Sequence, residues 1–521
     1  MQIIKYFAEH YTDLDKAQLK IECAATKGIT QGAQDEMKQF TKSTKSGNYQ
    51  GAHAKKNVQN GSDITIDELQ NDPLTQSGNM KIGIIGGGLM GMALAFRISE
   101  LNASVKVFER DSQLGGLSTH YNYGNFTWDK FYHVIVPTDG SLINLITDIG
   151  LGDSLNWSRS FTGYYVNKSF YSLNSPKEFL LFPLLNIWDK IRLVFTIFYG
   201  GRISNWKKLE GVTVKDWLIQ MGGKKNFNKF WEPLLLAKLG ENYKRVSAVF
   251  IWTYIRRLFK AREHPVEKDF MGYVSGGYKT VFDRLEKELI KNNSSILKNT
   301  SVKSIRPLDG GGIEVKYDDK VEHFDKVIFT APLNVLENVT SPEFCEIVKN
   351  DQAIEYLGVV CLALVTKKPL TPFYVLNMGD VNSPFTGVIG ISSLVDPEQT
   401  AGEYITFFPK YIPADHTYWS MPDETIEEIF MKGVRDLYPE LNDGDLVAAH
   451  INRAYKVQPL QVLNYSTIIP EIITKHPDFF VLNTSQFVSD SVNNNRVITH
   501  VNSFMEQFAV ELKTKAKTNT V

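Results

Sequence analysis

The chain has 521 residues, of which 43% are hydrophobic and 22% charged, which is the composition of a globular protein with two or three domains. Its 57 basic and 58 acidic residues leave a net charge of -1, so bulk charge argues against nucleic acid or an acidic macromolecule as a partner. The three cysteines, Cys23, Cys345 and Cys361, lie far apart, which excludes a zinc motif or disulfide framework and favours a cytoplasmic location.

Residues 1–79 differ from the rest of the chain. The stretch 42–63, KSTKSGNYQGAHAKKNVQNGSD, has few apolar anchors and is typical of linker or disordered chain. Residues 13–24 predict one short helix. Because Met80 opens a complete N-terminal strand, we expect residues 1–79 to be an extension and look for function after Met80.

From Met80 onward strands and helices alternate. The sequence KIGIIGG at 81–87 predicts a strand, 92–101 a helix, and SVKVFE at 104–109 a second strand. Two strands that flank a helix within about 30 residues form a βαβ unit. Further strands are predicted within 326–336 and 478–486.

Three glycines follow the first strand with the spacing G-x-G-x-x-G. Gly86 permits a tight turn, Gly88 lets the backbone approach a pyrophosphate, and Gly91 allows the helix to pack closely on the strand. The phosphates of a ligand would then lie at the helix N-terminus, where free N–H groups favour anions.

Two further features make this pattern more specific. Glu109 ends the second strand, where its carboxylate can accept hydrogen bonds from ribose hydroxyls and repel a 2′-phosphate. The stretch LGGLST then brings Gly115 and Gly116, a second glycine pair that a simple nicotinamide site does not require. A second approach of bare backbone implies a longer ligand.

This order of motifs resembles the flavin-containing amine oxidase and protoporphyrinogen oxidase-like superfamily, from about residue 80 to the C-terminus. The resemblance implies FAD rather than NAD, and an α/β fold with a Rossmann-like FAD-binding domain and an inserted α+β substrate domain. The implied FAD-binding domain comprises 80–155, 270–335 and 478–521. The implied substrate domain comprises 156–269 and 336–477.

A closer similarity, to uncharacterised bacterial protoporphyrinogen oxidase-like proteins, is carried by WDKFYHVIVPTD, FWEPLLLAKLG, GYVSGGYKTVFDRLEKEL, VQPLQV and NTSQFVSD. In such relatives the backbone at the Val302 strand meets the adenine side, and the last motif lies over the flavin. The cofactor contacts that the motifs and the resemblance together imply are Gly86, Gly87, Gly88, Gly91, Glu109, Arg110, Gly115, Gly116, Leu117, Ser118, Val302, Thr330, Gln458, Asp490 and Asn494.

The chain departs from the pattern of that family at two places. Ser491 and Val492 stand where the last motif usually continues with an Arg-Gly pair, which puts the flavin contacts of Asp490 and Asn494 in doubt. Leu117 stands where many amine oxidases have arginine, so one phosphate contact is expected to be missing.

Bound FAD itself accepts a hydride, so a side-chain base is optional. His133 could titrate near neutrality as an acid or base, or be a structural histidine held by hydrogen bonds. Lys238 could be a burial-shifted base, an anion contact, or a helix-end lysine whose charge lies in water.

The most apolar stretch, 179–208, is too interrupted to span a membrane, because Pro183, Asp189, Lys190 and Arg192 break it. It predicts either a buried helical pair that lines an apolar cavity or a peripheral contact at the inner face of the membrane.

The leading hypothesis is an FAD-dependent oxidoreductase that removes hydride from a C–N or C–C bond of an apolar or lipid-linked small molecule. The aromatic-rich middle of the chain motivates an apolar substrate. We expect non-covalent FAD, because no cysteine lies near the last strand. The alternatives are a redox-neutral flavin-dependent mutase or isomerase acting on a sugar or lipid-linked precursor, and a non-catalytic FAD-binding scaffold. The sequence leaves the oligomeric state open.

Overall fold

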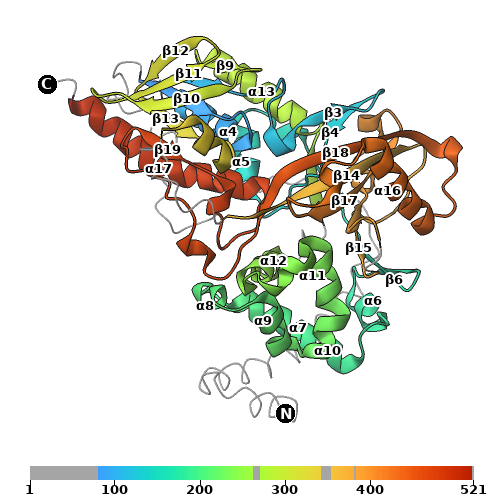
Figure 1. Ribbon diagram of the computed structural model, residues 1–521. Coiled ribbons are helices and arrows are strands. Elements are labelled where there is room, and N and C mark those ends of the chain that lie inside the picture. The colour runs from blue at the N-terminus through green and yellow to red at the C-terminus, as the bar shows by residue number, and fades with distance from the viewer. Residues whose placement is uncertain (1–79, 102, 262–269, 342–353, 381–382, 519–521) are drawn as a thin grey trace. The chain divides into compact units, whose positions relative to one another are not determined.

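The computed structural model describes residues 80–101, 103–261, 270–341, 354–380 and 383–518. Residues 1–79, with the short helix predicted at 13–24, lie outside the described residues. The described elements form a parallel sheet with its helices and a small antiparallel sheet, a larger second sheet, and a group of helices (Figure 1).

The parallel sheet has five strands and contains the predicted βαβ unit. In spatial order they are β19 (Phe479–Val481), β13 (Lys326–Phe329), β1 (Lys81–Ile85), β2 (Ser104–Phe108) and β9 (Ser295–Leu297). In the central strand β1, Ile84 lies opposite Val107 of β2 on one side and Ile328 of β13 on the other. A central parallel strand is buried on both faces, which explains the continuous apolar run KIGII.

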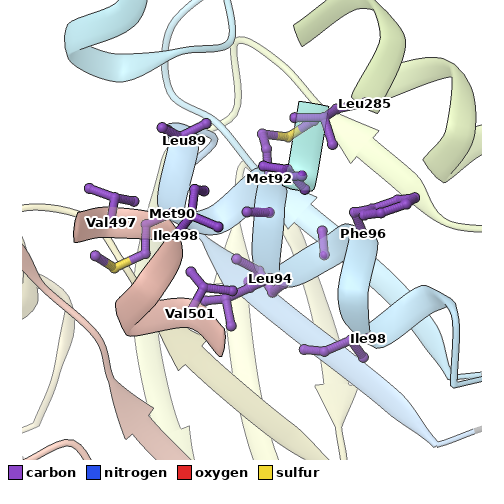
Figure 2. Packing of buried hydrophobic residues seen from close by; sticks show 14 of the residues in the cluster. Leu89, Met90, Met92, Leu94, Phe96, Ile98, Leu285, Val497, Ile498 and Val501 are labelled. Carbon is purple, nitrogen blue, oxygen red and sulfur yellow. The ribbon is translucent and has the colours of Figure 1, made fainter. Parts of the chain in front are cut away.

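Alternate side chains of β1 enter two different cores. Ile82 and Ile84 pack with α4, α5, α13 and α17, whereas Ile85 packs with the three-stranded antiparallel sheet β10–β11–β12. The bounds of these elements are α4 (Leu89–Ser99), α5 (Gly140–Asp148), α13 (Tyr278–Lys291), α17 (Asn494–Thr518), β10 (Val302–Pro307), β11 (Ile313–Tyr317) and β12 (Lys320–Phe324). Figure 2 shows side chains of α4 beside Val497, Ile498 and Val501 of α17.

Helix α4 differs from its prediction in where it begins. It starts at Leu89, not Met92, because Gly88 is the N-cap residue and Gly91 lies inside the first turn. All eleven residues of α4 are buried. The buried Arg97 keeps its charge paired, with Nη1 3.3 Å from Glu100 Oε2 and Nη2 2.5 Å from Asp148 Oδ2.

The second sheet has seven strands and was not predicted from the sequence. Its order is β18 (Leu446–Pro459), β14 (Tyr356–Thr366), β17 (Tyr404–Ile412), β16 (Gly387–Ile389), β15 (Val375–Met378), β6 (Thr162–Val166) and β7 (Ser169–Ser172). In β14, Leu362 lies opposite Phe408 and Ile451. Leu362 packs with α16 (Asp423–Leu437), whereas Cys361 enters a core on the opposite face.

The group of helices forms its own core around Trp217 and Trp252. The helices are α6 (Pro176–Leu181), α7 (Ile187–Arg202), α8 (Lys207–Glu210), α9 (Val214–Gly222), α10 (Lys224–Asn226), α11 (Glu232–Leu239) and α12 (Ala248–Ala261). Helix α6 begins with a capping box formed by Ser175 and Glu178, and Asn186 Oδ1 caps α7 by accepting from Asp189 N at 2.9 Å. The Asn186 cap therefore makes α7 a helix separate from α6 within 179–208.

Smaller elements connect these groups. They are β3 (His120–Asn122) with β4 (Thr127–Asp129), β5 (Leu155–Arg159) with β8 (Phe270–Val274), and α14 (Leu333–Val339). The strand predicted within 326–336 ends at Phe329, because Pro332 is the N-cap residue of α14, which begins at Leu333. Within the described ranges, no helix combines the length and apolarity needed to cross a bilayer.

Candidate functional site

The turn between β1 and α4 uses each of its glycines for a different reason. Gly86 has φ +112°, and a Cβ added to it would lie 2.8 Å from Thr330 Oγ1. A Cβ added to Gly91 would lie 1.9 Å from Gly86 O, so the helix rests directly on the turn. A Cβ added to Gly88 would meet only Gly116 Cα, at 3.9 Å. Protein packing therefore requires Gly86 and Gly91, while Gly88 borders free space.

The second glycine pair lies directly against this turn. Gly115 N donates to Gly87 O at 2.9 Å, and Gly88 and Gly115 form a β-bridge. Gly115 has φ +125° and Gly116 has φ +57°, a backbone region that glycine adopts most readily. Two stretches of bare backbone that lie far apart in the sequence thus come together next to the N-terminus of α4. No side chain of the described residues caps that N-terminus.

Glu109 lies beside the same turn. One carboxylate oxygen, Oε2, accepts from Gly87 N at 2.8 Å, and the other, Oε1, accepts from Asp111 N at 2.8 Å. Each oxygen keeps a second lone pair with which it can accept from another donor. The predicted ribose contact is compatible with this geometry and stays a prediction. Arg110 is exposed, with Nε 3.4 Å from Asp111 Oδ1.

The backbone of the segment before β10 hydrogen bonds to this strand end. Thr300 N donates to Glu109 O at 2.8 Å and Asn299 N donates to Asp111 O at 3.1 Å. Val302, the first residue of β10, follows two positions later. The structure therefore brings the segment before Val302 to the strand end that carries Glu109, and the adenine contact predicted for Val302 stays a prediction.

Thr330 and Asn494 also lie at the glycine turns. Thr330 Oγ1 donates to Ile85 O at 3.0 Å, and Asn494, the first residue of α17, donates from Nδ2 to Ser118 Oγ at 3.3 Å. Asp490 accepts from Ser491 N at 2.9 Å, just before α17 begins at Asn494.

Leu117 and Gln458 differ in their surroundings. The Leu117 side chain is 38% exposed beside Gly116. Gln458 lies elsewhere, on β18 of the second sheet, where its Nε2 donates to Pro459 O at 3.2 Å. The flavin contact predicted for Gln458 stays a prediction.

A buried carboxyl that the sequence analysis missed stands close to His133. Asp129 is 3% exposed, and its Oδ1 accepts from Tyr278 N at 2.8 Å at the start of α13. Burial raises the pKa of Asp129 to about 8, although the Tyr278 N–H opposes the shift. The only sequence signal was an acid at the end of a short strand, within the aromatic stretch FTWDKFYH.

His133 is held in its neutral form. Its Nδ1 lies 3.1 Å from Phe131 O and 3.8 Å from Asp129 Oδ2, and its ring meets the edge of Tyr278 with centroids 5.3 Å apart. A carbonyl can only accept, so Nδ1 carries the proton and Nε2 stays an acceptor. Burial lowers the pKa of His133 to about 4. The imidazole therefore does not titrate near neutrality, unlike the acid–base prediction.

The buried Asp129 carboxyl should make stability depend on pH. The folded chain holds its proton up to about pH 8, whereas an unfolded aspartate releases it near pH 4. The folded form thus binds the proton more tightly, and the free energy of unfolding falls as pH rises through this window. Asp129→Asn keeps the acceptor for Tyr278 N but cannot ionise.

Denaturant unfolding at about pH 6.5 and about pH 8 tests this, because His133 contributes little above its unfolded pKa of about 6.5. Between these pH values the free energy of unfolding should fall by about 2 kcal/mol more in the wild type than in Asp129→Asn. Equal losses in the two proteins would show that Asp129 is already ionised in the folded chain.

Lys238 takes part in a second cluster, formed from three separate elements. Its Nζ lies 3.6 Å from the ring centroid of Tyr411 on β17, and Tyr411 Oη lies 2.7 Å from Tyr132 Oη. Burial favours the neutral amine, but the Tyr411 and Tyr254 phenol groups outweigh it, so the pKa of Lys238 is raised. A raised pKa argues against the interpretation as a burial-shifted base, and the role of Lys238 stays a prediction.

The Lys238 cluster is connected to the glycine turns through the chain near Tyr132. Lys130 N donates to Thr119 O at 2.9 Å, which joins this segment to the second glycine loop. Asn452 Nδ2 on β18 donates to Lys130 O at 3.3 Å. The segment 128–133 therefore lies between the glycine turns and the second sheet. Among the described residues no group of three or more His, Cys, Asp or Glu side chains could hold a metal ion.

The sequence model of the family described as flavin containing amine oxidoreductase matches residues 89–465. Since this covers most of the chain, the protein belongs to that family, as the resemblance predicted. Membership of this family implies a flavin cofactor and oxidoreductase chemistry.

Among curated relatives, the zeta-carotene desaturase of Synechocystis sp. is 25% identical over 207 residues, 35% of this chain and 42% of that protein. The mitochondrial protoporphyrinogen oxidase of Nicotiana tabacum is 23% identical over 296 residues, 49% of this chain and 58% of that protein. The chain thus spans about half the length of the curated relatives that it matches.

Solved structures share the fold. An oxidoreductase from Methanosarcina mazei has a TM-score of 0.64 at 21% identity, covering 82% of this chain and 100% of that one. Reduced UDP-galactopyranose mutase has a TM-score of 0.64 at 16% identity, covering 83% of this chain and 96% of that one. Cyclohexylamine oxidase from Brevibacterium oxydans has a TM-score of 0.60 at 15% identity, covering 84% of this chain and 100% of that one. The predicted fold class, α/β with a Rossmann-like FAD-binding part and an inserted α+β part, is confirmed.

Proposed function

We propose that the chain holds FAD non-covalently along the contact between its two glycine turns and removes a hydride from a C–N or C–C bond of a largely apolar small molecule. The observation that carries this proposal is the free space at Gly88, where an added Cβ would meet only Gly116 Cα at 3.9 Å. An extended dinucleotide needs such a path along bare backbone. Bound FAD supplies the hydride acceptor.

The surrounding groups suit the different parts of a dinucleotide. The N-terminus of α4, which no side chain of the described residues caps, offers N–H groups to the pyrophosphate. Glu109 offers acceptors to the ribose hydroxyls, and Asn494 and Ser118 are polar groups at the turn itself. These donors and acceptors suit the pyrophosphate and ribose of FAD, whereas the Leu117 side chain offers no hydrogen bond to a phosphate.

Glu109→Ala tests the ribose contact. The substitution removes two charge-assisted acceptors, so the affinity for FAD is expected to fall roughly 10- to 100-fold. Titration of the FAD-free protein, followed by quenching of flavin fluorescence, measures the change. Asp111→Ala is the matched control, since Asp111 is an exposed neighbouring acid whose carboxylate lies beside Arg110. Equal effects of the two substitutions would assign the loss to general charge instead of the ribose.

Non-covalent attachment is supported by the position of the described cysteine. Cys361 lies in β14, fully buried in the second sheet, and burial raises the pKa of its thiol far above the usual range. A protonated, enclosed thiol is a poor nucleophile. Acid precipitation of the purified protein should leave FAD in the supernatant. A yellow pellet with a colourless supernatant would show a covalent bond.

An apolar substrate is supported by the cluster at Tyr132, Tyr411 and Lys238. Tyr132 is half-buried between the glycine loops and the second sheet, and burial together with Tyr411 raises its pKa well above the usual range. The Tyr132 phenol is therefore neutral, and the two rings present aromatic surface. The Lys238 ammonium, placed over the Tyr411 ring, can orient the polar end of a mostly apolar molecule. His133 is neutral and offers Nε2 as an acceptor.

Anaerobic mixing of the purified flavoprotein with candidate substrates tests the reaction. The names of the relatives suggest three types of candidate substrate: a polyene, a reduced tetrapyrrole and an alicyclic amine. Oxidation of the substrate with bleaching of the flavin absorption is the expected result. Turnover that begins only after dithionite reduction would favour the redox-neutral alternative. Tight FAD binding without either behaviour would favour the scaffold.

A further inference from the structure

Helix α7 has two apolar sides, and one of them stays exposed. Its inner side packs against the other helices, with a Cβ added at Gly200 only 3.2 Å from Ile255 and Trp217 side chains. The outer side carries Ile187, Ile191 and Val194, which are 54%, 37% and 53% exposed. The i, i+4, i+7 spacing places these three residues on one side of the helix. A helix on a protein surface normally presents polar residues there.

Neighbouring side chains extend this surface. Trp188 is 56% exposed, and Leu180 and Leu181 on α6 are 56% and 71% exposed. Lys190 Nζ donates to Leu180 O at 2.6 Å, which fixes the end of α6 beside α7 (Figure 1). We call the set Leu180, Leu181, Ile187, Trp188, Ile191 and Val194 the α6–α7 face. Single exposed apolar residues are ordinary, but a contiguous group indicates a binding surface. This exposure contradicts the predicted buried helical pair.

The surroundings of the α6–α7 face are basic. Lys229 Nζ donates to Leu184 O at 3.2 Å, and Lys225 Nζ lies 3.4 Å from Asp189 Oδ2, so both ammonium groups stand next to the face. Residues 176–229 contain ten Lys and Arg but four Asp and Glu, a local net charge of +6 in a chain of net charge -1. Asp189 and Glu210, two of those four acids, are buried, as is one of the ten cations, Lys190. The charge presented to solvent is thus strongly positive.

We propose that the α6–α7 face docks on the surface of a bilayer that contains anionic lipid. The leucine, isoleucine and tryptophan side chains would enter the interfacial region, and the flanking lysines would contact lipid phosphates. Tryptophan suits this depth because its ring is apolar and its N–H can hydrogen bond. A second copy of the chain fits less well, because a symmetric contact would place two surfaces of the same positive charge against each other. The proposal is independent of the flavin chemistry.

Vesicle flotation of the full chain tests the docking. Wild type should float with phosphatidylcholine vesicles that contain phosphatidylglycerol, less with phosphatidylcholine alone, and less again in high salt. Leu181→Glu and Trp188→Glu should each lower the partition coefficient about tenfold, because each removes an inserted apolar side chain. Ile290→Glu is the matched control, since Ile290 is 60% exposed on α13, and it should bind as wild type does.

Three outcomes would overturn the proposal. The first is a full chain that does not float with anionic vesicles, and the second is an equal loss of binding in Ile290→Glu. The third is a dimer that Trp188→Glu converts to a monomer, which would make the face an interface between copies. FAD content is measured on each variant, so a failure of the docking proposal is separate from a failure of the proposed function. Trp188→Phe should still bind but lose quenching of tryptophan fluorescence by brominated lipid.

Discussion

Leucine in place of Gly88 is expected to weaken FAD binding strongly while leaving the protein folded. Gly88 has φ -72° and ψ 178°, a backbone conformation open to any residue. An added Cβ comes no closer to the described protein than 3.9 Å, at Gly116 Cα. The leucine side chain would therefore fit the protein but fill the space through which the cofactor pyrophosphate passes. We expect the dissociation constant for FAD to rise at least roughly 100-fold.

Fluorescence titration of the FAD-free protein measures this change, and thermal unfolding without FAD checks that the fold is kept. Gly444→Leu is the matched control. Gly444 also has free space around its Cα and lies in the turn before β18, so this variant should bind FAD as wild type does. Undiminished affinity in Gly88→Leu would mean that the cofactor does not pass over this turn.

Alanine in place of Gly91 is expected to produce the opposite result, a loss of stability that does not depend on FAD. The added methyl group would lie 1.9 Å from Gly86 O, a backbone atom of a tight turn. Relief requires α4 to move away from β1, yet all eleven residues of α4 are buried. Overpacking of this kind is expected to lower the free energy of unfolding by about 3 kcal/mol or more.

Urea unfolding of the FAD-free protein measures this loss, and Gly88→Ala provides the comparison. Both variants add one methyl group within the same turn, but only the one at 91 meets a backbone atom. Gly88→Ala should stay within about 0.5 kcal/mol of wild type. Equal stability of Gly91→Ala and wild type would contradict the close packing of helix on turn.

The glycine turn could be predicted from the sequence because its information is local. Gly86, Gly88, Gly91 and Glu109 act within one βαβ unit, and each is explained by backbone geometry or by charge at a strand end. The start of α4 was predicted three residues late, because the low helix propensity of glycine favours a loop at Gly91. Close packing against Gly86 O requires glycine inside the helix there.

The second sheet could not be predicted in the same way. Its strand β14, YLGVVCLALVT, is buried on both sides and therefore lacks the alternation that marks a strand. Its partners in β17 and β18 follow only after long stretches of chain, as the pairing of Leu362 with Phe408 and Ile451 shows. Such contacts leave no local pattern.

The chemical state of the site residues also depends on distant contacts. Tyr132 meets Tyr411 across 279 residues of chain, and Asp129 meets Tyr278 across 149. The sequence identified His133 and Lys238 as titratable candidates but could not show how deeply they are buried. Burial lowers the pKa of His133 to about 4, while the nearby Tyr411 and Tyr254 raise the pKa of Lys238 against the effect of burial. Residue type alone predicted neither state.

A crystal structure of the full chain grown with FAD tests the central claim most directly. The account predicts density for one FAD per chain, with its pyrophosphate over Gly88 and Gly116 at the N-terminus of α4 and its ribose hydroxyls within hydrogen-bond distance of Glu109. FAD bound elsewhere, or a glycine turn that stays free of FAD at saturating concentration, would contradict it.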